Sequence, residues 1–281
     1  AINDDISVYG AYKTGFKSGG IDNNSLPTGG LVVNLESQDP AIRQSSIDVL
    51  QYESEESDGG EIGLRSRLLD QSLTLNITAF RYIFENLQVQ IFDPAVFAFS
   101  TFNAGELTTQ GIDVDFIWFT DLPGLSLSGA WSFLDTEISG DLIAASGANL
   151  KGRQGGFAPD ISGNVAINWE TSLNDSLMLS VSSNIAFKDD YFVGGSSLEP
   201  FDAVTNPLGD LAQDSYTTVD ANISVYPVDE SWKISLIATN LTDEEYITFA
   251  GPAPFRPATG DDQLVFLNRG RQVFIEAAFK F

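Results

Sequence analysis

Hydrophobic and polar residues alternate along much of the chain, with the period of two that is typical of β-strands. The final predicted strand spans 270–281, and its apolar face carries Val273, Ile275, Ala277, Phe279 and Phe281. Strands with one apolar and one mixed face also occur in soluble antiparallel sheets. An aromatic residue at the end of the strand instead favours a transmembrane barrel, where aromatic side chains form a girdle at each membrane interface.

The same alternation predicts about ten antiparallel strands, bounded by clusters of Gly, Asn, Asp, Ser and Pro. We place them at 5–17, 61–68, 72–90, 107–119, 125–138, 163–169, 176–187, 215–226, 232–240 and 270–281. The sequence therefore predicts an all-β protein.

The connections between these strands differ strongly in length. The short ones are 69–71, 120–124, 170–175 and 227–231. They alternate with long ones at 18–60, 93–106, 139–160, 188–214 and 243–269. Outer-membrane barrels have short periplasmic turns and long extracellular loops, whereas a soluble sandwich has no reason to segregate its loops in this way. We therefore expect an antiparallel transmembrane barrel.

Aromatic residues fall near the ends of the predicted strands. We expect one interfacial girdle at the short turns, made of Trp118, Phe119, Trp169, Tyr226, Trp232 and Phe281. A second girdle at the long loops contains Tyr12, Phe16, Tyr82, Phe133, Phe187 and Tyr191. Packing within a sheet explains any one of these aromatics equally well, so their joint placement carries the prediction.

Composition excludes several classes of function. The chain contains neither cysteine nor histidine, so disulfides, thiolate sites, imidazole zinc sites and a Ser-His-Asp triad are excluded. We expect no enzyme activity, no cofactor and no metal centre. The net charge of -25 repels nucleic acid. It fits a soluble surface in a saline habitat or an acidic mouth that attracts cations.

Hydropathy leaves the membrane prediction open. The sequence has no run of eighteen or more apolar residues, which excludes a transmembrane helix, but barrel strands give a much weaker signal. A mean hydropathy of -0.01 is compatible with strands whose second face is wet. Residues 1–5 are polar and resemble no signal peptide, so we expect the natural N-terminus to lie upstream.

Several segments together resemble a known family. They are 9–19 (YGAYKTGFKSG), 61–69 (EIGLRSRLL), 103–105 (NAG), 109–113 (TQGID), 240–246 (NLTDEEY) and 271–281 (RQVFIEAAFKF). In this order and spacing they resemble the C-terminal half of the barrel of a TonB-dependent outer-membrane receptor. Gly10, Gly63 and Gly111 would let the wall bend or let bulky neighbours pack. Asn240 and Asp243 would cap a strand end by bonding nearby backbone groups.

The resemblance implies a fold and a function. Family barrels have about twenty-two strands and an N-terminal plug that contacts the TonB energy complex. Residues 1–281 would then be the C-terminal part of such a barrel, with the plug and the first strands absent. The family imports scarce ligands, most often iron–siderophore chelates, across the outer membrane of Gram-negative bacteria. Phe279 and Phe281 would form the signal for the outer-membrane assembly machinery, with membrane lipid as a further partner.

Candidate ligand contacts are loop cations and one aromatic residue: Arg43, Arg153, Tyr191 and Arg256. A guanidinium suits an anionic chelate, and an aromatic ring suits a flat ligand or a sugar. These residues also fit a role in balancing the acidic loops. The acidic runs 53–58, 189–190 and 261–262 are typical of solvated segments, with weak calcium binding as the alternative.

Three other functions stay open. The chain fits a passive porin-like channel without a plug, and the same fold also imports glycans or cobalamin. A soluble all-β binding module, such as a glycan-binding sandwich, is the alternative outside the membrane. A plug and a TonB-contacting box upstream would distinguish active import from a passive channel.

Overall fold

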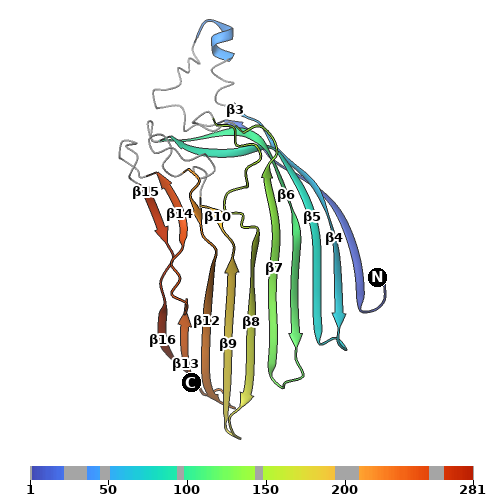
Figure 1. Cartoon of the computed structure of the whole chain (residues 1–281), viewed down its shortest axis with the longest axis vertical. Coiled ribbons are helices and arrows are strands. Elements are labelled where there is room, and N and C mark those ends of the chain that lie inside the picture. The colour runs from blue at the N-terminus through green and yellow to red at the C-terminus, as the bar shows by residue number, and fades with distance from the viewer. Residues whose placement is uncertain are drawn as a thin grey trace.

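A computed structural model shows a curved wall of ten antiparallel strands (Figure 1). The strands are hydrogen-bonded in the order β1-β4-β5-β6-β7-β8-β9-β12-β13-β16, so neighbours in the sheet are also neighbours along the chain. Strands β1 and β16 form the two edges of this open sheet. The structure describes residues 2–21, 37–44, 51–93, 98–142, 148–193, 209–252 and 263–280.

The ten wall strands have the following bounds: β1 Ile6–Lys17, β4 Glu55–Leu68, β5 Leu73–Asp93, β6 Ala98–Phe119, β7 Leu125–Ile138, β8 Ile161–Ser172, β9 Leu177–Lys188, β12 Tyr216–Pro227, β13 Trp232–Thr239 and β16 Gln272–Phe279. Three small antiparallel pairs lie in the long connections. They are β2 Gly20–Ile21 with β3 Gln51–Tyr52, β10 Tyr191–Phe192 with β11 Ala212–Gln213, and β14 Ile247–Pro252 with β15 Gln263–Leu267.

The predicted architecture is confirmed. The short connections all lie at one end of the wall, here called the short-turn end, and the long connections lie at the other, the long-loop end (Figure 1). Residues 40–44 form a short helix. Over the described ranges, no helix combines the length and apolar character needed to cross a bilayer.

Two predicted loops are shorter than expected. Strand β4 begins at Glu55 although residues up to 60 were predicted as loop, because this acidic, glycine-containing stretch pairs with strands on both sides. Strand β6 begins at Ala98, so residues 98–106 are not irregular. Asn86 and Gly105 adopt positive φ where the pairing steps from Glu85↔Glu106 to Leu87↔Ala104, and this irregularity hides the alternation.

The alternation gives the wall an apolar face and a polar face. One row across the sheet joins Val8, Leu64, Ile77, Val114 and Trp131 on the apolar face. Strand β16 continues this face, and Val273, Ile275 and Phe279 are 59%, 75% and 63% exposed. These residues therefore do not lie in a compact core, as predicted. Such exposure is expected where lipid covers the sheet.

The predicted girdles are only partly correct. Trp118, Trp169 and Trp232 lie on the apolar face near the short-turn end, as expected. Phe119 and Tyr226 lie on the polar face, because each is one residue out of phase with these tryptophans. Tyr12, Phe16, Phe133 and Phe187 lie on the apolar face, whereas Tyr82 lies on the polar one and Tyr191 is buried. Residue 281 lies outside the described part of the chain.

Glycine makes room for aromatic rings on the polar face. A Cβ on Gly63 would come within 2.2 Å of the Tyr9 ring, which lies across the strand pair. The same ring contacts the Arg65 guanidinium at 4.8 Å and Thr78 Oγ1 through its hydroxyl at 3.1 Å. A Cβ on Gly111 would meet the Phe80 ring at 3.0 Å. The predicted role is therefore confirmed at these two positions, whereas at Gly10 the nearest atom is 3.7 Å away.

We predict that Gly63→Ala destabilises the wall by about 1–3 kcal/mol, because the new methyl group must displace the Tyr9 ring and its two contacts. Gly10→Ala is the matched control, since its methyl group meets only ordinary contacts. The measurement is the free energy of unfolding of the membrane-embedded protein in urea. Equal stability of the two variants would contradict the packing role of Gly63.

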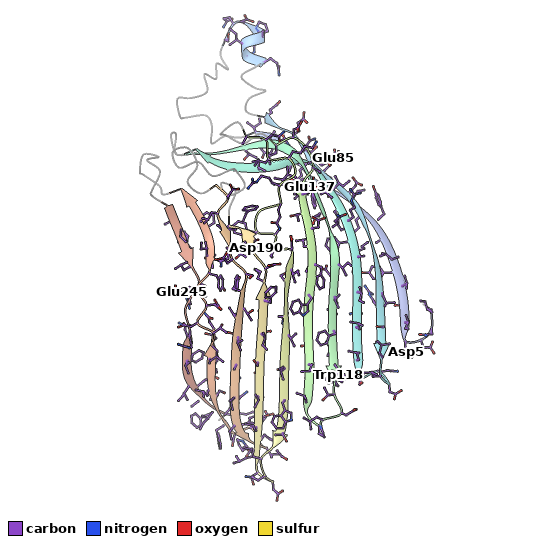
Figure 2. The ribbon with its side chains drawn as sticks, in the orientation of Figure 1. Asp5, Glu85, Trp118, Glu137, Asp190 and Glu245 are labelled. Carbon is purple, nitrogen blue, oxygen red and sulfur yellow. The ribbon has the colours of Figure 1, made fainter. Side chains whose placement is uncertain are left out.

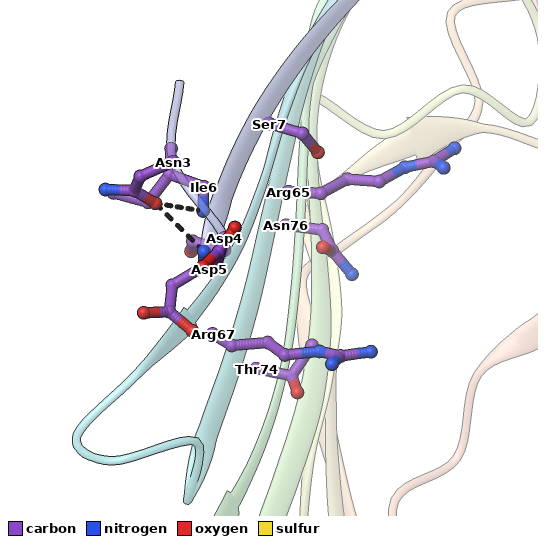
Figure 3. Close-up of a pocket in the computed structure, with 10 residues that line it drawn as sticks. Asn3, Asp4, Asp5, Ile6, Ser7, Arg65, Arg67, Thr74 and Asn76 are labelled. Atoms are coloured by element: carbon purple, nitrogen blue, oxygen red, sulfur yellow. Dashed lines mark hydrogen bonds between the residues drawn. The ribbon is translucent and has the colours of Figure 1, made fainter. Parts of the chain in front are cut away.

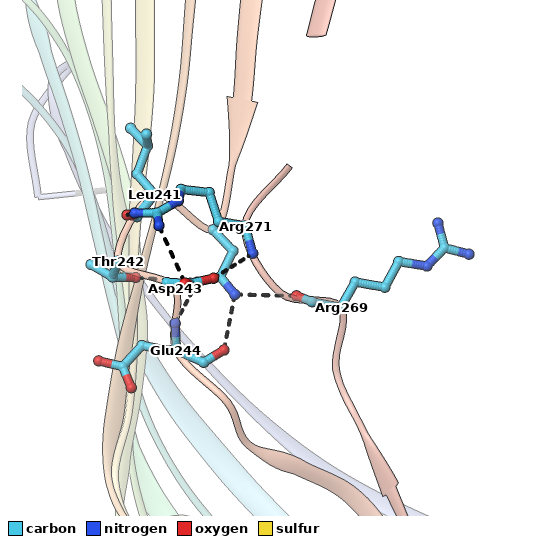
Figure 4. A network of polar contacts seen from close by, with 7 residues as sticks. Leu241, Thr242, Asp243, Glu244, Arg269 and Arg271 are labelled. Carbon is cyan, nitrogen blue, oxygen red and sulfur yellow. Dashed lines mark hydrogen bonds and ion pairs between the residues drawn. The ribbon is translucent and has the colours of Figure 1, made fainter. Parts of the chain in front are cut away.

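A polar network fixes the β13–β16 connection at the long-loop end (Figure 4). Asn240 is buried and donates from Nδ2 to the carbonyl oxygens of Glu244 and Arg269, at 2.9 and 3.1 Å. Its Oδ1 accepts from the Glu244 amide at 3.0 Å. Asp243 accepts from the Arg271 amide at 2.8 Å and pairs with its guanidinium at 3.3 Å. The predicted capping by Asn240 and Asp243 is confirmed.

We predict that Asn240→Ala lowers the free energy of unfolding by about 3 kcal/mol, because two carbonyls and one amide lose their buried partner. Asn240→Asp is expected to be nearly as damaging, because a carboxylate cannot donate to the two carbonyls. Asn168→Ala, at an exposed position on the polar face, is the control. Urea unfolding of the three variants checks this, and an Asn240→Asp variant of wild-type stability would contradict it.

Candidate functional site

The polar face offers the side chains that a water-soluble ligand could contact. Serine, threonine, asparagine and aspartate dominate it, as in the pairs Ser132–Asp113 and Asn164–Asn184. Near the middle of strands β1, β4 and β5, Glu61 accepts from Lys13 Nζ at 2.8 Å and from the Tyr82 hydroxyl at 3.0 Å. Charges on this face are therefore partly paired across strands.

Two arginines closer to the short-turn end are exceptions to this pairing. Arg65 and Arg67 are two residues apart on β4, so both side chains extend from the same face (Figure 3). Together with Ser7, Thr74 and Asn76, they line a concave region of about 370 Å³, which Asp4 and Asp5 also border. Among the residues that the structure describes, neither guanidinium forms an ion pair. The pair can bind a carboxylate, phosphate or other oxyanion.

Sequence reasoning did not select these two arginines. The alternation in 61–68 already placed them on one face, opposite Ile62 and Leu64. Two cationic side chains at positions i and i+2 on the polar face of a predicted strand would have indicated an anion-binding pair. The residues predicted as ligand contacts all lie in predicted loops, whereas Arg65 and Arg67 lie in a predicted strand.

The long-loop end is acidic. Glu85, Glu137, Asp190 and Glu245 lie toward this end, whereas Asp5 and Trp118 lie toward the short-turn end (Figure 2). Part of the predicted solvated acidic run belongs to strand β4, where Glu55 accepts from the Gln88 amide at 2.8 Å. Within the described residues, no group of three or more carboxylates is arranged to hold a metal ion. The predicted acidic pair 261–262 lies outside the described residues.

Arg153 lies where two long connections meet. Its guanidinium pairs with Asp210 and lies over the Phe192 ring at 5.2 Å. The backbone of Arg153 is fixed as well, since its carbonyl accepts from the Ile138 amide at 2.8 Å. The buried Nε has no partner among the residues that the structure describes. Arg153, predicted as a ligand contact, therefore connects two long loops in the structure.

Tyr191 belongs to a small buried cluster with Val193 and Ala250. Only 6% of it is exposed, and its hydroxyl donates to the Ile247 carbonyl at 3.4 Å. Lys188 Nζ lies 5.6 Å from the ring. The structure thus places Tyr191 beneath the surface of the long-loop end, close to Arg153, because Phe192 follows it in the chain.

The other predicted residues are spread over the chain. Arg43 is exposed in the short helix and donates to the Ser37 carbonyl at 2.9 Å, remote in sequence from the other contacts. Arg256 and Phe281 lie outside the described residues. Phe279 is exposed on the apolar face, opposite Trp232 in the register. Their roles stay predictions.

Asp160, directly before β8, lies close to other carboxylates at the long-loop end. Partial burial, together with the carboxylates of Asp189, Asp190 and Asp135, raises the pKa of Asp160. Its Oδ1 accepts from Gln154 Nε2 at 2.8 Å. A raised pKa means that the folded state binds the proton more tightly than the unfolded chain. Protonation therefore favours the folded loop at low pH, and this advantage is lost as the pH rises through the folded pKa.

We predict that Asp160→Asn flattens the pH dependence of loop stability above the ordinary pKa of an aspartate, about 4, because asparagine keeps the Oδ1 acceptor but carries no charge. At neutral pH the backbone amides of the variant loop are expected to exchange more slowly with solvent than those of the wild-type loop. The measurement is hydrogen exchange over residues 148–160, corrected for intrinsic rates. Asp121→Asn, in a short turn, is the control, and an unchanged pH profile in Asp160→Asn would contradict the account.

Comparison with known proteins identifies relatives of most of the chain. A family model described as "TonB dependent receptor-like, beta-barrel" matches residues 1–241. The metal-pseudopaline receptor CntO of Pseudomonas aeruginosa is 27% identical over 205 residues, which cover 69% of this chain and 25% of the receptor.

Solved structures show the same fold. The ferric yersiniabactin uptake receptor FyuA from Yersinia pestis aligns with 100% of this chain and 36% of its own, at a TM-score of 0.71 and 20% identity. The siderophore receptor PiuA from Acinetobacter baumannii aligns with 98% of this chain and 34% of its own, at a TM-score of 0.64 and 20% identity. The chain thus spans between a quarter and about a third of the length of these relatives.

Proposed function

The chain belongs to the TonB-dependent receptor-like β-barrel family, and from this premise we propose that it forms part of an outer-membrane importer of a scarce metal chelate. The chain supplies wall and loops. Its location would be the outer membrane of a Gram-negative bacterium, with the apolar face in lipid and the polar face toward the lumen. The short-turn end would be periplasmic and the long-loop end extracellular.

The main support for this proposal is a wall with one apolar and one polar face, whose short connections lie at one end and long connections at the other, in a chain of this family. The relatives named above are receptors for metal-pseudopaline, ferric yersiniabactin and siderophores, which favours a metal chelate, most simply an iron–siderophore complex, over a glycan or cobalamin. Transport by such a receptor breaks no bond, so we propose no catalytic role.

The described residues suggest how an oxyanionic chelate would be held. At the mouth, Arg153, whose guanidinium pairs with Asp210, is a proposed contact, with Arg43, Tyr191 and Arg256 as further proposed contacts. Deeper on the polar face, Arg65 and Arg67 offer two guanidiniums. The acidic mouth limits the net negative charge that such a cargo can carry, because it repels anions.

The proposed partners follow from the same function. An N-terminal plug in the lumen would connect the wall to the TonB energy complex. Lipid would contact the apolar face, and Phe279 and Phe281 would present the end of β16 to the outer-membrane assembly machinery.

We predict that deleting the gene lowers the uptake of at least one iron chelate about tenfold or more under iron limitation, and that a protonophore abolishes this uptake in the wild type. The measurement is accumulation of radiolabelled iron from a panel of chelates. Uptake that survives the protonophore would favour a passive channel, and unchanged uptake of every iron chelate after deletion would remove the iron–siderophore proposal.

The variant Arg65→Gln/Arg67→Gln tests the lumenal contacts in the same assay. We expect uptake to fall about tenfold, because two charge-assisted contacts to an oxyanion are lost. Arg81→Gln is the matched control, since Arg81 lies on the opposite face of the same sheet. Equal uptake by both variants would contradict a role for the arginine pair.

A further inference from the structure

A cavity of about 260 Å³ lies on the polar face at the long-loop end. Its walls come from strands β5, β6 and β7, from Leu142 and from the segment 155–158. The apolar residues that line it are Leu87, Val89, Leu107, Ile138, Leu142 and Ala158. Because the polar face elsewhere carries mainly hydroxyl, amide and carboxylate groups, this apolar lining is a local departure from the alternation.

The two polar side chains of the lining already have partners. Thr136 Oγ1 accepts from the Gly155 amide at 3.0 Å, and Glu106 Oε1 accepts from the Ser139 hydroxyl at 2.6 Å. A bound water needs two to four polar partners, so the cavity offers water little and an apolar group a favourable environment.

The cavity is preformed, because backbone hydrogen bonds fix the segment beside it. The Gly152 amide donates to the Ile138 carbonyl, and the Leu150 amide donates to the Leu142 carbonyl, both at 2.8 Å. Ile138, Leu142 and Leu150 form a buried cluster that anchors this segment against β6 and β7. Gly155 fits this wall of the cavity, because a Cβ there would come within 3.2 Å of Thr136 Oγ1.

We propose that this cavity is a subsite for an apolar arm of the imported small molecule, a single aromatic ring or a branched alkyl group of similar size. The inference rests on the proposed function, since it assigns the cavity to the cargo. An apolar cavity of about 150 Å³ is enough to bind benzene, so the space here takes a substituted ring.

One residue of the cavity lining is hydrogen-bonded to the backbone of Arg153. Ile138 lines the cavity, and its amide donates to the carbonyl of Arg153, whose guanidinium lies over Phe192. The apolar subsite and the cationic group therefore belong to one rigid unit. The guanidinium already pairs with Asp210, so the arrangement suits an amphiphilic chelate whose apolar arm occupies the cavity and whose polar groups lie toward the Arg153–Asp210 pair.

Crystals of the full-length receptor soaked with iodobenzene test the subsite directly. Detergent covers the apolar face, whereas the cavity lies on the polar face, so the position of the iodine anomalous peak identifies the cavity. We expect a peak in the cavity of the wild-type protein and of Leu134→Trp. The peak should be lost in Leu107→Trp, whose indole fills the space. Leu134 lies on the same face of β7 as Thr136 and Ile138, which line the cavity, but does not itself line it.

Val89→Phe is a second filling variant in case Leu107→Trp does not fold, and heat-modifiable electrophoretic migration reports folding. An empty cavity in the wild-type crystal at saturating iodobenzene would overturn the inference. A peak that persists in a folded filling variant would overturn it as well.

The transport assay separates this inference from the proposed function. If a chelate is imported, filling the cavity should lower its uptake roughly tenfold to hundredfold, while Leu134→Trp leaves uptake unchanged. Unchanged uptake in a folded filling variant would overturn the assignment to the cargo. If the wild-type protein imports no chelate, the proposed function fails, and the assignment to a cargo arm fails with it, whereas the iodobenzene peak alone still establishes an apolar binding cavity.

Discussion

Every backbone N–H and C=O group at the depth of a bilayer must find its hydrogen-bond partner within the protein. The eight inner strands of the wall satisfy this constraint through continuous antiparallel ladders, whereas β1 and β16 pair on one side only within the described part of the chain. Once the ladders are fixed, a one-residue shift of register would turn a whole strand over. The separation of an apolar face from a polar face therefore depends on the pairing, and everything else in the wall depends on that separation.

Packing details hold the register at both ends. Gly63 accepts the Tyr9 ring, which in turn positions Arg65 on the polar face. At the long-loop end, Asn240 donates to two backbone carbonyls of the β13–β16 connection. The long connections also contact one another. Arg153 joins the segment after β7 to Asp210, and Tyr191 lies in a buried cluster at the same end of the wall. The wall thus carries a structured mouth.

Alternation predicts the strands well because it reflects the one constraint that acts on every residue of the wall. It fails where that pattern is broken locally: the acidic residues of early β4 resembled loop, and the positive φ of Asn86 and Gly105 interrupts the pattern around β5 and β6. The candidate site was harder to predict. The partners of Arg153 and the apolar cavity near Leu107 arise from contacts between distant segments, which period and composition do not report.

The orientation of the two faces can be measured directly, because the chain has no cysteine and single labels are unambiguous. Ala166 lies on the polar face of β8 and Ile167 on the apolar face. Spin labels at Ala166→Cys and Ile167→Cys in the membrane-embedded protein can be compared by their collisions with oxygen and with a water-soluble nickel complex. We expect the label at 167 to collide mainly with oxygen and the label at 166 mainly with nickel; equal or reversed accessibility would contradict a lipid-facing apolar wall.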